Sequence, residues 1–199
     1  MELIIATRNP GKLREFARIL SPLGITVSSQ EQHCPGLEVD ETGTTFAENA
    51  RLKAQAIYEA TGKPTVADDS GLCVDALEGR PGVYSARYGG PGFSDPQRVQ
   101  KLLAELGGTP KEQRTGRFVS AICCVLGPQR MIECEGVCEG WIGYEPLGEN
   151  GFGYDPVFMV GDKSYSQMSD GDKDAVSHRG KALALFYKEM KEAHQGADK

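Results

Sequence analysis

The stretch Val66-Ala67-Asp68-Asp69-Ser70-Gly71 places two adjacent carboxylates directly after a short apolar run. The run from Thr65 to Ala67 predicts a buried strand that ends at Ser70-Gly71. Ligands bind at the carboxyl ends of strands in open α/β sheets, and a divalent cation relieves the repulsion between close carboxylates. A solvated turn is the plainer interpretation, because Asp, Ser and Gly are common turn residues.

The composition bounds the class of protein. The chain has 199 residues, of which 39% are hydrophobic and 25% charged, and this predicts a globular protein over residues 1–199, either as one domain or as two lobes that share a sheet. A net charge of −6 argues against a large nucleic-acid surface. We find no basic stretch followed by an apolar segment at the N-terminus and no apolar run of membrane length, so we expect no membrane partner and a cytoplasmic protein.

A polar, glycine-containing loop follows the first predicted strand, Leu3 to Ala6. This loop is Thr7-Arg8-Asn9-Pro10-Gly11-Lys12, and a helix with apolar residues at helical spacing follows it up to Leu20. The arrangement directs backbone N–H groups and the positive end of a helix dipole at one point, where Lys12 adds a full charge. It suits a phosphate, although many strand-to-helix turns share the pattern.

A second helix is predicted from a capping box formed by Thr45 and Glu48, and Gly62 ends it. Asn49 and Lys53 lie one turn apart at the border of its apolar stripe. A lysine in such a place ordinarily extends its ammonium to solvent. A phosphate contact is the functional alternative.

Further along the chain, Leu72 to Leu77 predicts another strand. Residues 117–126 and 131–142 predict two long strands joined by a tight turn. Cys134 and Cys138 share a face of the second of these strands and would lie roughly 13 Å apart, too far for a disulfide or a shared zinc. We therefore expect reduced thiols.

Two later stretches carry residues suited to nucleotide binding. Three glycines surround one Phe, one Tyr and one Asp in residues 148–156, where the backbone can approach a ligand and a ring can stack on a base. The polar stretch 162–176 predicts a flexible loop, and Ser177-His178-Arg179-Gly180 opens the last helix. Cations are unfavourable at the positive end of a helix dipole, so His178 and Arg179 indicate a bound anion or base edge.

Together, these basic groups, carboxylates and rings indicate a nucleotide hydrolase. The same stretches resemble, in order, the sequence blocks of the inosine triphosphate pyrophosphatase family. Thr7 to Lys12 is similar to its T-x-N-x-x-K opening, except that Arg8 stands where glycine is common. The other similar blocks are Thr45 to Ala54, Asp68 to Leu72, Pro81 to Tyr88, Phe152 to Pro156 and Ser177 to Gly180.

The resemblance implies an α/β fold with an elongated, curved mixed sheet, flanking helices and two lobes around a nucleotide cleft. It implies a homodimer that hydrolyses the purine nucleoside triphosphates ITP, dITP and XTP to the monophosphate and pyrophosphate with Mg²⁺, which cleanses the nucleotide pool. A purine nucleotide sensor without catalysis is the alternative from another class, because it would use the same cations.

The resemblance also implies roles for individual residues. Asp69 would be the catalytic base and, with Glu41, a metal ligand, while Asp68 would assist. The residues expected to bind substrate are Thr7, Arg8, Asn9, Pro10, Gly11, Lys12, Lys53, Ser70, Phe152, Gly153, Tyr154, Asp155, Lys173, His178 and Arg179.

Overall fold

The computed structural model describes the backbone of residues 1–195 and the side chains of residues 1–192. The described strands form one sheet in the order β2-β1-β3-β4-β5-β6-β7. Strand β1 runs parallel to β2 and β3, whereas β6 runs antiparallel to β5 and β7. The strands are β1 (Glu2–Ile5), β2 (Thr26–Ser29), β3 (Thr65–Val74), β4 (Thr115–Gly127), β5 (Arg130–Ile142), β6 (Phe158–Val160) and β7 (Lys163–Ser164).

Helices flank this sheet, so the expected α/β class with a mixed sheet is confirmed. The α-helices are α1 (Pro10–Leu20), α2 (Gln30–His33), α3 (Phe46–Thr61), α4 (Asp95–Glu105), α5 (Asp170–Val176) and α6 (His178–Gln195). Short 3₁₀ turns are η1 (Ser21–Leu23), η2 (Asp75–Leu77), η3 (Gly82–Arg87), η4 (Lys111–Gln113) and η5 (Tyr165–Gln167). None of the described helices is both long enough and apolar enough to cross a membrane.

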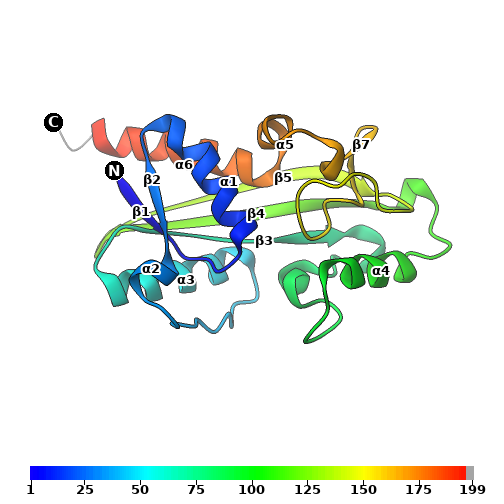
Figure 1. The fold of residues 1–199 in the computed structure, drawn as a ribbon, viewed down its shortest axis with the longest axis horizontal. Coiled ribbons are helices and arrows are strands. Elements are labelled where there is room, and N and C mark those ends of the chain that lie inside the picture. The colour runs from blue at the N-terminus through cyan, green and yellow to red at the C-terminus, as the bar shows by residue number, and fades with distance from the viewer. Residues whose placement is uncertain (196–199) are drawn as a thin grey trace. The chain divides into compact units, whose positions relative to one another are not determined.

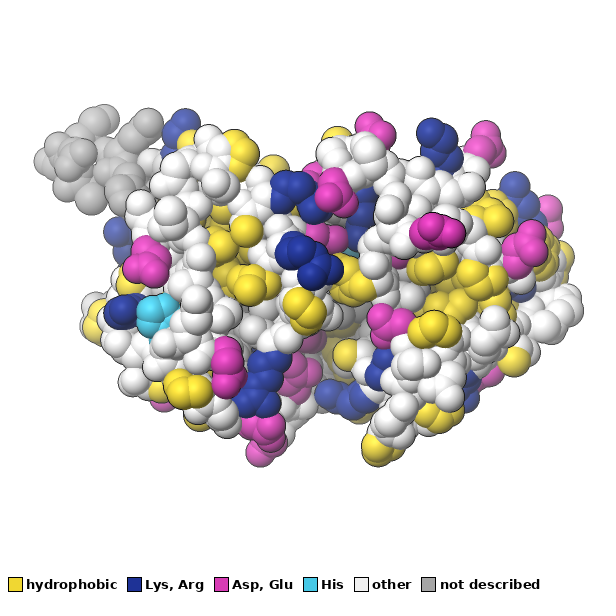
Figure 2. Space-filling model, in the orientation of Figure 1, with side chains coloured by type: hydrophobic (Ala, Val, Ile, Leu, Met, Phe, Trp, Pro, Cys, Tyr) yellow, Lys and Arg dark blue, Asp and Glu magenta, His cyan; other side chains and the backbone are white. Residues whose placement is uncertain are grey.

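The chain divides into two compact units. The first contains Met1–Asp69, Ser120–Gly136 and the chain from His178 onward, and the second contains Ser70–Val119 and Val137–Ser177. Acidic and basic side chains are interspersed over the face shown in Figure 2, in keeping with 28 acidic and 22 basic residues. The six cysteines, which all lie in the described part of the chain, form no disulfide, as expected from the spacing of Cys134 and Cys138.

The first unit buries its strands between helices on two faces. Leu3, Ile5 and Val66 pack on one face, and Ile4 and Ala67 pack on the other, because successive strand residues point to opposite sides. Helices α1 and α6 cover the first of these faces, and α3 covers the second (Figure 1). Every position along β1 is therefore apolar after Glu2, which explains its continuous hydrophobic sequence.

The second unit has its own core. Helix α4 contributes Val99 and Leu102, which belong to one cluster with Phe118, Phe158 and Tyr165. The rings of Phe118 and Phe158 meet edge to face with centroids 4.8 Å apart, and those of Phe158 and Tyr165 with centroids 4.9 Å apart.

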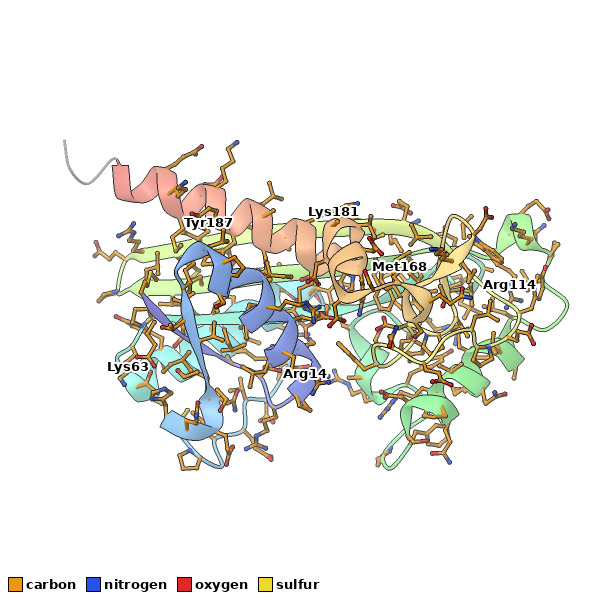
Figure 3. All side chains as sticks on the ribbon, turned by 45° about the horizontal axis from the view of Figure 1, so that its top comes forward. Arg14, Lys63, Arg114, Met168, Lys181 and Tyr187 are labelled. Atoms are coloured by element: carbon orange, nitrogen blue, oxygen red, sulfur yellow. The ribbon has the colours of Figure 1, made fainter. Side chains whose placement is uncertain are left out.

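Arg114, labelled in Figure 3, is buried at one end of the second unit. Its guanidinium donates to three backbone carbonyls, those of Leu106 (2.9 Å), Ile142 (2.7 Å) and Gly143 (2.7 Å). These contacts tie the end of β5 to the turn after α4. Burial lowers the pKa of Arg114 from its ordinary value.

Three sequence predictions are wrong. Strand β3 does not end at Ser70-Gly71, and no separate strand begins at Leu72, because one strand continues from Thr65 to Val74. Strand β1 pairs only with the start of β3, at Thr65 and Val66, whereas β4 is its neighbour on the other side. Pairing with β4 outweighs the local turn preference of Asp, Ser and Gly. The polar stretch after Val160 is also not a flexible loop, since it forms β7, η5 and α5, with Ser169 capping α5 at the backbone N–H of Asp172 (3.2 Å).

A glycine in β5 allows helix α6 to approach the sheet closely. A Cβ atom at Gly136 would overlap the carbonyl oxygen of His178 and lie 2.5 Å from the backbone nitrogen of Ala182. We expect Gly136→Ala to lower the free energy of unfolding by at least about 2 kcal/mol, because backbone atoms must move to admit the methyl group. Urea unfolding measures this change. Gly127→Ala, at the end of β4 where a Cβ meets nothing within 4 Å, is the matched control, and an equal effect of both variants would contradict the prediction.

Candidate active site

The candidate site of the first unit lies where β1 ends beside β3. The two strands pair through Ile4↔Thr65 and Ile5↔Val66, and the N–H of Ala6 donates to the carbonyl of Val66 at 2.9 Å. Two residues further along β3, the carbonyl of Asp68 accepts from two lysine ammonium groups, Lys12 (3.3 Å) and Lys53 (3.1 Å). In the sheet, β2 lies on one side of β1 and β3 lies on the other, so the strand order reverses at β1. Open α/β sheets bind ligands at such a switch point.

The first predicted loop caps helix α1. Asn9 is the N-cap, and its side-chain oxygen accepts from the N–H groups of Gly11 (2.8 Å) and Lys12 (3.2 Å). Thr7 supports the cap, because its hydroxyl accepts from the N–H of Asn9 at 3.1 Å. Asn9 thus already binds two of the backbone donors that we assigned to a phosphate.

Arg8, in this loop, and Arg14, in helix α1, are exposed. The guanidinium of Arg8 donates to Glu38 (2.6 Å) and to the carbonyl of Leu37 (3.3 Å), both in the loop that leads to Glu41. Arg14 lies on the exposed side of α1 (Figure 3). The bulky cation at position 8 therefore joins two loops of the first unit.

Asp68 points to the side of the sheet covered by α1 and α6, as Val66 does. Its Oδ2 accepts from Lys12 (2.8 Å) and from Arg179 (3.0 Å), and its Oδ1 accepts from the hydroxyl of Ser120. Burial by itself raises the pKa of this carboxyl, but the charges of Arg179 and Lys12 outweigh it and hold the pKa of Asp68 well below its usual range. Asp68 is thus an ionised, buried anchor for two cations.

Asp69 points to the opposite side, toward α3. Its Oδ1 accepts from Lys53 at 2.8 Å, and its Oδ2 from the side-chain amide of Asn49 at 3.4 Å. Lys53 also contacts Glu41 Oε1 at 2.9 Å, so one ammonium bridges two carboxylates. Burial raises the pKa of Asp69 although Lys53 and Lys12 oppose the change. A raised pKa suits a general base, since efficiency grows as the pKa approaches the working pH.

The two lysines have opposite pKa shifts. Burial lowers the pKa of Lys12, and its contact with Asp68 compensates only in part. Burial also acts to lower the pKa of Lys53, but Asp69 and Glu41 more than offset this effect and raise the pKa. Lys53 is therefore held in its charged form by the same carboxylates that it bridges.

Arg179 is the second residue of helix α6 and is buried in the first unit. Its guanidinium donates to Glu15 and to Asp68. These carboxylates supply the negative charge that offsets a cation at the positive end of the helix dipole, a role that we assigned to a bound anion. Burial acts to lower the pKa of Arg179, yet Asp68 and Glu15 raise it from its ordinary value. His178, also predicted, is buried beside it.

The remaining predicted residues belong to the second unit, where Phe152, Asp155 and Lys173 form a cluster of their own. Lys173 and Asp155 make a buried ion pair at 2.7 Å, and the carboxylate of Asp155 also accepts from the N–H of Phe152 at 2.9 Å. The Lys173 ammonium lies 5.1 Å from the centroid of the Phe152 ring. Tyr154 donates its hydroxyl hydrogen to the carbonyl of Ser85 at 2.9 Å. This cluster presents an aromatic ring beside a cation.

Three residues of the first-unit cluster were not among the predicted site residues. Glu15 holds Arg179, Ser120 holds Asp68, and Asn49 holds Asp69. A serine inside the apolar run of β4 was a signal for Ser120, and the capping-box helix had already placed Asn49 next to Lys53. Glu15 had no such signal, because its partner lies 164 positions away in the sequence.

The carboxylates of Glu41 and Asp69 fit a hard divalent cation. The carboxylate oxygens of both residues can serve as ligands, and both carboxylates contact the ammonium of Lys53. Residues 1–192 contain no group of three His, Cys, Asp or Glu side chains arranged to hold a metal. Mg²⁺ needs no such cage, because it is bound by one or two carboxylates together with substrate phosphates and water.

The ion pairs of Asp68 make it a test of the buried network. We expect Asp68→Asn to lower the free energy of unfolding at pH 7 by about 3 kcal/mol, since Lys12 and Arg179 stay buried without their shared anion. The folded-state pKa of Asp68 is lowered, so the wild-type advantage is full at neutral pH and shrinks as the pH falls below about 4.

Chemical unfolding at several pH values measures this difference. Asp75→Asn is the control: Asp75 is exposed and paired with Arg117 at 2.8 Å, and such pairs contribute at most about 1 kcal/mol. Equal losses in the two variants, or an Asp68→Asn effect that does not depend on pH, would refute the anchor role.

Known proteins resemble this chain in sequence and in fold. The sequence profile described as the Ham1 family matches residues 3–189. The chain is 48% identical over 189 residues to the dITP/XTP pyrophosphatase of Bacillus subtilis, covering 94% of this chain and 96% of that protein. It is 50% identical over 192 residues to the dITP/XTP pyrophosphatase of an Exiguobacterium species, covering 96% and 97%.

A solved structure shows the same fold. The Ham1 protein of Staphylococcus aureus superposes with a TM-score of 0.86 and 40% sequence identity, covering 97% of this chain and all of that one. The resemblance to the inosine triphosphate pyrophosphatases is thereby confirmed. Because the profile, the relatives and the fold agree over nearly the whole length, the chain belongs to the Ham1 family.

Proposed function

We propose that this protein hydrolyses non-canonical purine nucleoside triphosphates, namely ITP, dITP and XTP, to the monophosphate and pyrophosphate. The observation that carries the proposal is the convergence of Lys12 and Lys53 on Asp68, beside the carboxylates of Asp69 and Glu41. Relatives that share nearly half of the residues are dITP/XTP pyrophosphatases, which supports this substrate class.

The chemistry follows from the positions of the charged groups. Asp69, whose pKa is raised by burial, takes a proton from the attacking water, and the water oxygen bonds to the α-phosphorus. The bond from the α-phosphorus to the bridging oxygen breaks, and pyrophosphate leaves. Lys12 and Lys53 stabilise the negative charge that develops on the phosphate oxygens.

Magnesium ion is the proposed cofactor, with Glu41 and Asp69 as its ligands. When bound, it screens the polyphosphate charge and stabilises the departing pyrophosphate. Thr7 to Lys12, Lys53 and Ser70 are proposed to contact the phosphates and sugar, and His178 and Arg179 the base and phosphates. Arg179, whose guanidinium donates to two carboxylates, is proposed to position Asp68.

The base is proposed to bind at Phe152 to Asp155 and Lys173. The Phe152 ring offers a stacking surface, and the Lys173 ammonium is a donor that lies 5.1 Å from it. Hypoxanthine and xanthine carry a 6-keto acceptor, whereas adenine carries an amino donor there. A donor facing adenine loses its partner, and an unpaired donor costs binding energy.

The assembly and location stay predictions. We propose a homodimer in the cytoplasm, where the triphosphate pool would be its substrate. Neither property enters the chemistry above, because the cluster of Lys12, Lys53, Asp68 and Asp69 lies within one unit of one chain.

Product analysis tests the function directly. The purified protein is incubated with ITP, dITP, XTP, GTP and ATP in the presence of Mg²⁺, and nucleotides, pyrophosphate and orthophosphate are quantified. We expect monophosphate and pyrophosphate from ITP, dITP and XTP and far less from ATP. Release of orthophosphate and a diphosphate indicates another phosphohydrolase, and binding of ITP without turnover indicates a nucleotide sensor.

Asp69→Asn tests the catalytic base. The amide keeps the size of the side chain but cannot take a proton, so we expect the rate of ITP hydrolysis to fall by about 10²- to 10⁴-fold. The unfolding midpoint should stay close to that of the wild type, which shows that the fold is intact. Asp75→Asn, an exposed carboxylate change, should leave the rate unchanged. A variant at position 69 that hydrolyses ITP at nearly the wild-type rate would exclude Asp69 as the base.

A further inference from the structure

The ammonium of Lys53 has no donor left for a substrate. Its Nζ lies 2.8 Å from Asp69 Oδ1, 2.9 Å from Glu41 Oε1 and 3.1 Å from the carbonyl oxygen of Asp68. A lysine ammonium has three N–H donors and no acceptor. Lys53 can therefore bind a phosphate oxygen only by giving up one of these three acceptors.

Two of those three acceptors are the carboxylates proposed to hold the metal. The Lys53 side chain is only 13% exposed, so water screens its charge weakly. A divalent cation on the same oxygens would lie next to this ammonium, and like charges at such distances repel. The ammonium and the metal therefore compete for Glu41 and Asp69.

Lys12 differs from Lys53 in this respect. Among the described residues its ammonium has two acceptors, Asp68 Oδ2 at 2.8 Å and the Asp68 carbonyl oxygen at 3.3 Å. One of its three donors is left for a phosphate oxygen. Lys12 can thus bind a polyphosphate without releasing a carboxylate, and it does not contact Glu41 or Asp69 through any of these bonds.

We propose that Lys53 is an internal counter-ion of the metal site and that a polyphosphate opens this site. Phosphate oxygens draw the ammonium of Lys53 away from Glu41 and Asp69, and the two carboxylates then bind the metal. Metal and polyphosphate therefore bind cooperatively, each raising the affinity for the other. This inference rests on the proposed function, because it takes Glu41 and Asp69 as the metal ligands.

The test measures Mn²⁺ binding in the absence of any nucleotide, by the electron paramagnetic resonance of free Mn²⁺. We expect weak binding to the wild type and binding at least about tenfold tighter to Lys53→Met. An adjacent positive charge lowers the proton affinity of a carboxylate by about 10- to 1000-fold, and we expect a similar effect on its affinity for a metal cation. Lys12→Met is the matched control: it removes the same charge from the same cluster, and we expect a change below about threefold.

A second variant separates charge from size. Lys53→Arg keeps the positive charge and should bind Mn²⁺ as weakly as the wild type. Thermal unfolding gives an independent readout, because a ligand that binds only the folded state raises its midpoint. Mn²⁺ alone should raise the midpoint of Lys53→Met and leave those of the wild type and Lys53→Arg unchanged. If Lys53→Met does not fold, Lys53→Gln serves in its place.

Equal Mn²⁺ affinity in the wild type and Lys53→Met would overturn the proposal, as would an equal gain in the two Met variants. The first result would mean that Lys53 does not compete with the metal, and the second that only total charge matters. No nucleotide is present in these measurements. A failure here is therefore distinct from a failure of the pyrophosphatase assay, which concerns the wild-type protein with its substrate.

Discussion

The candidate site depends on one backbone carbonyl, that of Asp68. Strand β1 ends at Ile5, which pairs with Val66 of β3. The acidic pair of β3 begins two residues after Val66 and therefore lies beyond the end of β1. At this point lysines from α1 and α3, helices on opposite faces of the sheet, both reach the same carbonyl oxygen. Side chains from opposite faces can meet only past the end of a strand, so the length of β1 determines where the cations converge.

Strand alternation then gives the two adjacent carboxylates different environments. Asp68 faces Lys12 and Arg179, whose charges hold its pKa well below the usual range. Asp69 faces Lys53 and Asn49, and burial raises its pKa. Two identical side chains, one residue apart, are thereby suited to different tasks. Asp68 stays ionised and holds cations in place, whereas Asp69 can accept a proton.

The sequence predicted the parts that local chemistry determines. Thr45, Glu48 and Gly62 mark α3 almost to the residue, since a capping box and a left-handed glycine act within a few positions. The sequence did not predict that β3 continues through Ser70-Gly71, because pairing with the neighbouring strand β4 overrides a turn preference. Nor did it predict α5, a seven-residue helix too short to show an apolar stripe. Glu15 was missed because a buried ion pair between distant residues leaves no local pattern.

The buried network is better explained by function than by stability. Four carboxylates (Glu15, Glu41, Asp68 and Asp69) and three cations (Lys12, Lys53 and Arg179) lie in one unit, and removing such groups from water is costly. Apolar residues of similar volume would often stabilise a fold as well or better. These buried charged groups suit the proposed site, where a polyanion and a metal replace internal contacts with contacts of similar strength. The free energy of opening the site is then low, because each broken ion pair is succeeded by another.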